Sequence, residues 1–201
     1  MQYTKRDWRN RNKIKTPNGL KWLTVPVEVK GKYFQKIKDT QVSQPNWSDS
    51  HLGMLKQNYS KSPHYKEIMP FVEGLYAKAS SLSTISEINA LFIKNICDFL
   101  GIQTKISFSW DYELIGENPT DRLVNVCVQA NATDYYSGPA AQNYMDESAF
   151  TEKGINVHYY DYSGYAEYSQ LHGEFEHGVT VLDVLFQTGT NFHNYFKYLK
   201  A

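Results

Sequence analysis

Long apolar runs are missing from this 201-residue sequence. No stretch approaches the roughly 18 consecutive apolar residues that a membrane-spanning helix needs, and the first residues lack the apolar core of a secretory signal. An excess of charge of either sign is also missing, because Lys plus Arg and Asp plus Glu both number 21. Since no overall field attracts nucleic acid or an anionic membrane, any basic character must be local. We therefore expect a cytoplasmic protein that neither binds nucleic acid nor inserts into a membrane.

Cysteine and recognisable catalytic motifs are scarce too. The two cysteines, Cys97 and Cys127, lie in apolar helical runs, so we expect both to be reduced and buried. The histidines lack the spacing of metal ligands, and no Gly-x-Ser-x-Gly elbow, Walker loop or dinucleotide fingerprint occurs. These absences argue against a serine hydrolase, a P-loop enzyme and a Rossmann dehydrogenase. We expect no disulfide, no metal site and no cofactor.

Strand and helix patterns alternate along the chain. The turn signals of Thr16–Gly19 predict a hairpin, a capping-box pattern predicts a helix that begins at Thr84, and Asn118 opens another helix. Pro70 should kink or restart the helix that follows Pro63. Other strands are expected at residues 21–27, 103–108, 133–137 and 155–160, and other helices at residues 48–59, 179–187 and 192–199.

This alternation predicts an α/β fold with a mostly parallel sheet on which helices pack. The length suits one domain, residues 1–201. We divide that domain into a basic and hairpin part at residues 1–47, a helical part at residues 48–101 and an α/β part at residues 102–201.

A first candidate ligand site lies at Ser137–Gly138, where a predicted strand turns into a predicted helix. In an open α/β sheet the strand ends and helix starts form the ligand crevice, because free N–H groups and the helix dipole favour an anion there. We place Ser137 and Gly138 nearest the ligand. The same Ser-Gly-Pro sequence is also typical of a plain turn, and the residues alone leave both interpretations open.

A second candidate site is the basic and aromatic segment at the start of the chain. Five cations fall within residues 5–13, together with an indole and two amides. Arginine forks bind phosphate through two hydrogen bonds, a tryptophan offers a stacking face, and asparagine amides bond hydroxyls. The group suits a nucleotide sugar or another phosphorylated small molecule, although a solvated basic segment has the same composition. The residues expected to bind the ligand are Lys5, Arg6, Trp8, Arg9, Asn10, Arg11 and Asn12. We expect this segment and the Ser137–Gly138 turn to lie on the same side of one sheet.

Two titratable side chains are candidates for catalysis. His51 lies on a predicted helix, where general acid–base work and a structural role are both open. Asp183 lies in the apolar run Val179–Leu185, so its carboxylate must either be paired or face a cavity. The residues alone leave this choice open as well.

Further motifs follow one another along the whole chain. They are Met1–Asn12, Trp22–Val27, Trp47 with His51, Thr120–Leu123, Tyr136–Ala140, and Tyr168–Phe175 leading into Val181–Phe186. In this order they resemble the WbqC-like family of bacterial proteins. The resemblance implies a protein of surface-polysaccharide (O-antigen) synthesis, and Arg122 joins Arg9 and Arg11 as an expected phosphate-binding residue.

The chain departs from the family pattern at its start. Family members usually begin with an additional strand and loop, and here Met1 stands in their place. The resemblance therefore implies a copy truncated at its N-terminus. The additional loop looks like the first strand and phosphate-facing turn of nucleotidyltransferase-like folds, so by analogy we expect a truncated nucleotidyltransferase-like fold.

Two functions from different classes follow from these patterns. The first is a group transferase that acts on a nucleotide-linked amino sugar. The alternative is a non-catalytic nucleotide-sugar binding or partner protein in the same pathway. A transferase should have a polar cleft that joins the first twelve residues to the Ser137 turn and holds a titratable group such as His51 or Asp183.

Overall fold

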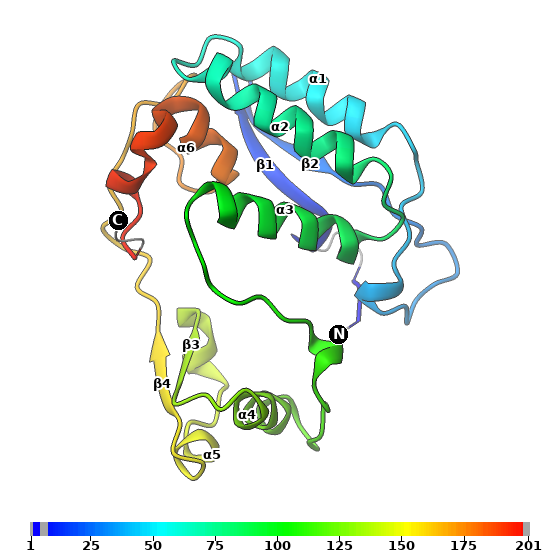
Figure 1. Cartoon of the computed structure of the whole chain (residues 1–201), viewed down its shortest axis with the longest axis vertical. Coiled ribbons are helices and arrows are strands. Elements are labelled where there is room, and N and C mark those ends of the chain that lie inside the picture. The colour runs from blue at the N-terminus through cyan, green and yellow to red at the C-terminus, as the bar shows by residue number, and fades with distance from the viewer. Residues whose placement is uncertain (1, 5–7, 199–201) are drawn as a thin grey trace. The chain divides into compact units, whose positions relative to one another are not determined.

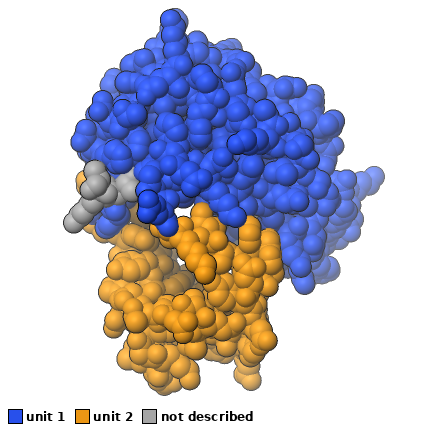
Figure 2. Space-filling model, in the orientation of Figure 1, with its two compact units in different colours: residues 1–103, 165–201 blue, residues 104–164 orange. Residues whose placement is uncertain are grey.

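Helices and two small sheets make up the computed structural model, which describes residues 2–4 and 8–198 (Figure 1). Two compact units share the chain (Figure 2): residues 1–103 and 165–201 form unit 1, and residues 104–164 form unit 2. Unit 1 is therefore built from two separate stretches of the sequence, while unit 2 is one continuous insertion. Two of the expected ligand-binding residues, Lys5 and Arg6, lie outside the described residues.

A hairpin stands near the start of unit 1. The 3-10 helix η1 (Trp8–Asn10) leads into β1 (Arg11–Thr16), which pairs antiparallel with β2 (Gly19–Thr24). Thr16 lies opposite Gly19, whose φ of 92° falls in the left-handed region that glycine adopts without strain. The hairpin predicted from the turn signals is thus confirmed.

The helices of unit 1 share one core with this hairpin. Their bounds are η2 (Ile37–Asp39), α1 (Trp47–Tyr59), α2 (Tyr65–Ala79), α3 (Ile85–Phe99), α6 (Val181–Thr188) and η5 (Gly189–Tyr195). α2 contacts α1, α3 and α6, and α1 also contacts both strands of the hairpin (Figure 1). The fully buried apolar side chains of β1, α1, α2 and α6 include Ile14, Leu55, Ile68, Val72, Leu185 and Phe186.

Unit 2 contains a short parallel strand pair and small helices. Its elements are η3 (Ser109–Asp111), α4 (Pro119–Gln129), β3 (Asp134–Ser137), η4 (Pro139–Asn143), α5 (Ser148–Thr151) and β4 (Asn156–Tyr159). β3 and β4 pair in parallel, with Tyr136 opposite His158. Val124, Cys127, Phe150 and Ile155 form the buried core of this unit.

Capping residues set two of the helix starts. At α3 the Thr84 hydroxyl accepts a hydrogen bond from Glu87 N (3.2 Å), and the Glu87 carboxylate accepts one from Thr84 N (3.0 Å). Asn118 caps α4 in the same way with Asp121. Both predicted helices are confirmed, because such caps satisfy backbone N–H groups that the helix itself leaves unpaired. α2 continues through Pro70, so no new helix starts there.

The mostly parallel sheet expected from the sequence is not found among the described residues. β1 pairs with β2 and β3 with β4, so the expectation that the basic segment and the Ser137–Gly138 turn share one sheet is wrong. The strand expected at residues 103–108 is also wrong, because these residues are mostly exposed and Phe108 stacks on Trp110 with ring centroids 4.4 Å apart. Alternation of apolar side chains does not make a strand without a partner that completes the hydrogen-bond ladder.

Two predicted helices have a tighter form than expected. The helix expected after Gly138 is the five-residue 3-10 helix η4, and the first half of the helix expected at residues 192–199 belongs to the 3-10 helix η5. A single domain with boundaries at 47/48 and 101/102 stays a prediction. The upper boundary falls close to residue 103, where the first stretch of unit 1 ends. No helix within the described residues is long and apolar enough to span a bilayer.

Candidate functional site

A cavity of about 500 Å³ opens in unit 1. This volume lies in the range that small-molecule ligands fill. Six residues predicted as ligand-binding or catalytic line it, namely Trp8, Arg9, Asn10, Arg11, Asn12 and His51. The other lining residues are Leu23, Val25, Trp47, Tyr76, Ile88, Asn89, Phe92, Ile93, Ile96, Cys97, Thr180, Val181 and Leu182. We call this cavity the unit 1 pocket.

Aromatic rings form a buried part of the pocket lining. The ring centroid of Trp47 lies 5.2 Å from that of His51 and 5.7 Å from that of Tyr76. The Tyr76 ring meets Phe92 in a T-shaped contact at 5.1 Å. Trp47, His51 and Tyr76 are each only 4% exposed. Because edge-to-face contacts fix the orientation of the rings, this part of the pocket is rigid.

Arg9 and Arg11 of the pocket lining each lie over an aromatic ring, that of Trp8 in the lining and that of Trp22 outside it. Arg9 Cζ lies 4.4 Å from the ring centroid of Trp8, which is 71% exposed. Arg11 Cζ lies 4.1 Å from the ring centroid of Trp22, and Lys13 Nζ approaches the same ring at 5.2 Å. Cation–π attraction orients each guanidinium plane. Two oriented positive charges at one pocket favour an anionic ligand.

Hydrogen bonds hold the Trp8–Asn12 segment in place. Asn10 Nδ2 donates to Val25 O (2.9 Å), and Val25 N donates to Asn10 O (2.8 Å). From α3, Asn89 Nδ2 donates to Arg9 O at 2.9 Å. Within the described part of the chain, Asn10 Oδ1 and Arg11 Nε are buried and have no hydrogen-bond partner. Unsatisfied buried polar atoms are uncommon, and a bound ligand or water is one explanation for them.

Both ring nitrogens of His51 take part in hydrogen bonds. Nε2 lies 3.0 Å from Thr24 O, and a carbonyl can only accept, so Nε2 carries a proton. Nδ1 lies 3.3 Å from the Tyr76 hydroxyl, which donates to it in the neutral ring. Burial lowers the pKa of His51 below its usual value, which favours this neutral form. The ring is held firmly in the pocket wall, and a catalytic role for it stays a prediction.

Asp183 is not one of the pocket-lining residues. Its carboxylate, 1% exposed, accepts hydrogen bonds from the Tyr59 hydroxyl (2.8 Å), the Tyr168 hydroxyl (2.9 Å) and Gln170 Nε2 (3.1 Å). Burial raises the pKa of Asp183, and the three donors oppose that rise. Of the two alternatives left open by the sequence, these contacts favour the paired carboxylate, while catalysis by Asp183 stays a prediction.

Lys15, which no sequence pattern marked as a site residue, belongs to the same buried network. The residue is 6% exposed, and its Nζ donates to Gln170 Oε1 (2.8 Å) and to Glu174 O. Its backbone N also donates to the Tyr59 hydroxyl at 3.2 Å. No local pattern marks such a lysine, because the two oxygens that accept from its ammonium group lie 155 and 159 residues further along the chain. Tyr76 and Asn89 were missed for the same reason.

The remaining predicted site residues belong to unit 2, whereas unit 1 alone lines the pocket. Arg122 is exposed on α4, Ser137 ends β3, and Gly138 caps η4. With only five residues in a 3-10 conformation, η4 is too short to provide the helix dipole expected at this turn. A ligand-binding role for these three residues stays a prediction.

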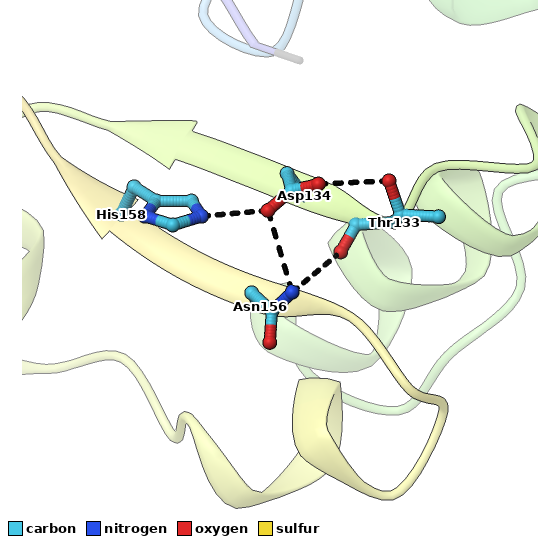
Figure 3. A network of polar contacts seen from close by, with 4 residues as sticks. All are labelled: Thr133, Asp134, Asn156 and His158. Carbon is cyan, nitrogen blue, oxygen red and sulfur yellow. Dashed lines mark hydrogen bonds and ion pairs between the residues drawn. The ribbon is translucent and has the colours of Figure 1, made fainter.

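Polar side chains join β3 and β4 around Asp134, the first residue of β3 (Figure 3). His158 Nε2 lies 2.7 Å from Asp134 Oδ1, and Thr133 Oγ1 donates to Asp134 Oδ2 at 2.8 Å. Asn156 Nδ2 also donates to Asp134 Oδ1, at 3.4 Å. These hydrogen bonds, that of His158 first, lower the pKa of Asp134. The Tyr136 ring stacks on His158 with centroids 4.6 Å apart.

The cysteines differ in their surroundings. Cys127 is buried in the unit 2 core with 8% exposure. Cys97, which was also expected to be buried, is half-buried because its helix face lines the pocket.

Comparison with known proteins identifies the family. The profile of the WbqC-like protein family matches residues 1–195, so the chain belongs to this family, as its motifs suggested. It is also similar to "Uncharacterized protein Rv1507c" of Mycobacterium tuberculosis (strain ATCC 25618 / H37Rv). The two are 46% identical over 200 residues, which cover 100% of this chain and 86% of the relative. No solved structure matches the chain at a significant level.

Proposed function

We propose that this protein binds a nucleotide-linked sugar in the unit 1 pocket and serves the synthesis of a bacterial surface polysaccharide such as O-antigen. The pathway rests on what the resemblance to the WbqC-like family implies. The observation that carries the binding role is the joint lining of one pocket by the Trp8–Asn12 segment and the aromatic group around His51.

The two kinds of lining residue suit two parts of such a ligand. Arg9 and Arg11 bring positive charge to one region of the pocket, where a diphosphate would find guanidinium donors. Exposed Trp8 offers a face on which a planar base would stack. A volume of about 500 Å³ accommodates part or all of a ligand of this size.

The geometry supports a non-catalytic binding protein better than it supports a group transferase. His51 is the histidine of the pocket lining, and both of its nitrogens already have partners. Transfer of a group to a nucleotide-linked amino sugar is the second candidate. It is favoured by the unprotonated Nδ1 of His51, which would accept a proton from a substrate amine once the Tyr76 hydroxyl turns away.

Cys97 offers a direct test of the binding role. It lines the pocket, whereas Cys127 lies in the other unit and serves as an internal control. We expect UDP-N-acetylglucosamine, or a dTDP- or GDP-linked sugar, to slow alkylation of Cys97 by iodoacetamide without changing the rate at Cys127. If no nucleotide sugar protects Cys97 or binds in calorimetry, the proposal is wrong.

Charge variants test the phosphate contacts. Arg11→Gln should weaken the binding of the best nucleotide sugar about tenfold or more, because a charge-assisted hydrogen bond is lost. Lys21→Gln is the matched control, since Lys21 is exposed in the same hairpin and does not line the pocket. Equal losses in both variants would indicate general charge attraction and no specific site.

His51→Gln separates the two candidate functions. In a binding protein this variant should keep most of its affinity, and no modified sugar should be detected by mass spectrometry for either variant or native protein. In a transferase the native protein should yield a modified amino sugar in the presence of the group donor, and His51→Gln should bind the sugar but yield none.

A further inference from the structure

Unit 1 contains a basic and aromatic loop that begins after Val27, which bridges to Val42, and leads into the 3-10 helix η2. At residues 28–36 it carries Tyr33 and Phe34, which are 79% and 85% exposed. No other large apolar side chain among the described residues is as exposed as these two. Exposing two adjacent aromatic side chains to water is unfavourable, so we expect a partner surface to cover them.

The loop backbone is held by hydrogen bonds. Gln35 Nε2 donates to Glu28 O at 2.7 Å, which ties the two sides of the loop together. Lys32 N donates to Val29 O (3.2 Å), and Gln2 Nε2 donates to Tyr33 O (2.8 Å). These contacts fix the loop in a form that leaves the two rings outside the core.

Lysines surround the two rings. Within residues 28–39, Lys30, Lys32, Lys36 and Lys38 are all exposed, and the acidic residues are Glu28 and Asp39. Four positive charges against two negative charges leave an excess of two. Lys32 pairs with Glu28, so the excess resides on the remaining lysines. This local charge contrasts with a whole chain in which the charges cancel.

We propose that residues 28–38 form a docking loop for an anionic lipid bilayer. Phe34 and Tyr33 enter the region between headgroups and acyl chains, where aromatic rings are favoured, and the lysines contact lipid phosphates. Lysine stems also cover apolar surface while their ammonium groups stay in water. Phe34 has no polar group, so its ring can enter a bilayer without leaving a hydrogen-bonding atom unsatisfied. Docking of this kind is peripheral and needs no helix that crosses the bilayer.

Vesicle sedimentation tests the docking loop. We expect the protein to bind vesicles made of phosphatidylglycerol and phosphatidylcholine in equal parts, to ignore vesicles of phosphatidylcholine alone, and to bind less as salt rises. Lys30→Gln, Lys36→Gln and Lys38→Gln together should weaken binding on the order of a hundredfold, at about fivefold for each lysine. Phe34→Ala should weaken binding about tenfold or more, because its apolar ring no longer enters the bilayer.

Matched variants and a depth probe complete the test. Lys61→Gln, Lys66→Gln and Lys78→Gln remove three exposed lysines elsewhere, and Tyr144→Ala removes a ring that is 76% exposed in unit 2. Both controls should bind vesicles as the native protein does. In Phe34→Trp, the added fluorescence should be quenched by brominated lipids. The proposal is overturned if the native protein does not bind, if loop and control variants lose affinity equally, or if binding needs the lysines but not Phe34. The last result would point to a soluble polyanion as partner, with heparin binding as its readout.

Discussion

Two charged residues of unit 1, Asp183 and Lys15, are buried and bonded to residues far away in the sequence, whereas the bonded pairs of unit 2 lie at the surface and join nearer residues. Asp183 bonds Tyr59 across 124 residues, and Lys15 bonds Gln170 across 155. In unit 2, His158 bonds Asp134 across 24 residues, and Tyr159 bonds Glu147 across 12. A buried polar group left without its partner is costly, while water replaces the partner of an exposed one. The buried network around Asp183 in unit 1 therefore depends on tertiary structure to a degree that the surface pairs of unit 2 do not.

The largest expected effects come from the two cores. Phe186 is fully buried and stacks on Tyr59 at 5.0 Å, so Phe186→Ala should lower the free energy of unfolding by about 4 kcal/mol. Phe150 is equally buried, but in the small unit 2 core, where it stacks on Tyr135. Hydrogen exchange should therefore rise in residues 104–164 for Phe150→Ala, and in residues 8–103 and 165–198 for Phe186→Ala. Exchange that rises along the whole chain in both variants would show that the units do not unfold separately.

Removal of the buried carboxylate should have the next largest effect. Asp183→Ala leaves two phenol hydroxyls, an amide and the nearby Lys15 without their acceptor or counter-charge, and should destabilise the protein by about 3 kcal/mol in urea unfolding. Asp98→Ala, at an exposed position on α3, is the control and should change stability little. A loss for Asp183→Ala no larger than that of the control would mean that the network adds nothing to folding.

A smaller effect should appear in the pH dependence of stability. Burial lowers the pKa of His51 in the folded state, so the unfolded chain binds its proton more readily. The contribution of neutral His51 to stability is complete above the pKa of about 6.5 that its ring has in the unfolded chain. It is lost as the pH falls toward and through the lower pKa of the folded state. Between pH 7.5 and pH 5.5, native protein should therefore lose up to about 1.4 kcal/mol more stability than His51→Gln. Parallel losses in both proteins would show that His51 titrates normally.

The smallest effect is expected at the exposed pair of unit 2. Asp134→Asn removes the charge that faces His158, but water solvates both groups, so the melting temperature at pH 7 should stay unchanged within error. The lowered pKa of Asp134 gives the sign of its pH effect: any stabilisation is present above its unfolded pKa and is lost as pH falls through the lower folded value. A drop in melting temperature as large as that of Asp183→Ala would break the contrast between the units.

Features set by a few neighbouring residues could be predicted from the sequence. Thr84 with Glu87, and Asn118 with Asp121, define helix starts through contacts three residues apart. The hairpin depends on the turn at Pro17 and Asn18, which is equally local. The grouping of Trp8–Asn12 as one ligand-binding segment was also a local inference, and these residues line one pocket.

Features that depend on distant partners could not be predicted. The sheet was expected to be continuous, but a strand pattern does not name its partner, and the strands of the two units pair separately. Lys15 looks like a solvated cation until Gln170 and Glu174 fold over it. His51 was expected on a helix and lies on α1, yet its two hydrogen-bond partners come from β2 and α2.

The discontinuous path of unit 1 bears on the order in which the chain folds during synthesis. Thr180 N donates to Lys13 O at 2.8 Å, and Leu185 and Phe186 of α6 complete the core around β1, α1 and α2. A ribosome releases residues 104–164 before α6, so the nascent unit 1 lacks its last α-helix while unit 2 is already complete in sequence. Domains tend to fold as soon as their residues emerge. Here the first stretch of unit 1 is synthesised well before the helix that completes its core. Its apolar surface therefore stays exposed, and open to aggregation, until α6 is available.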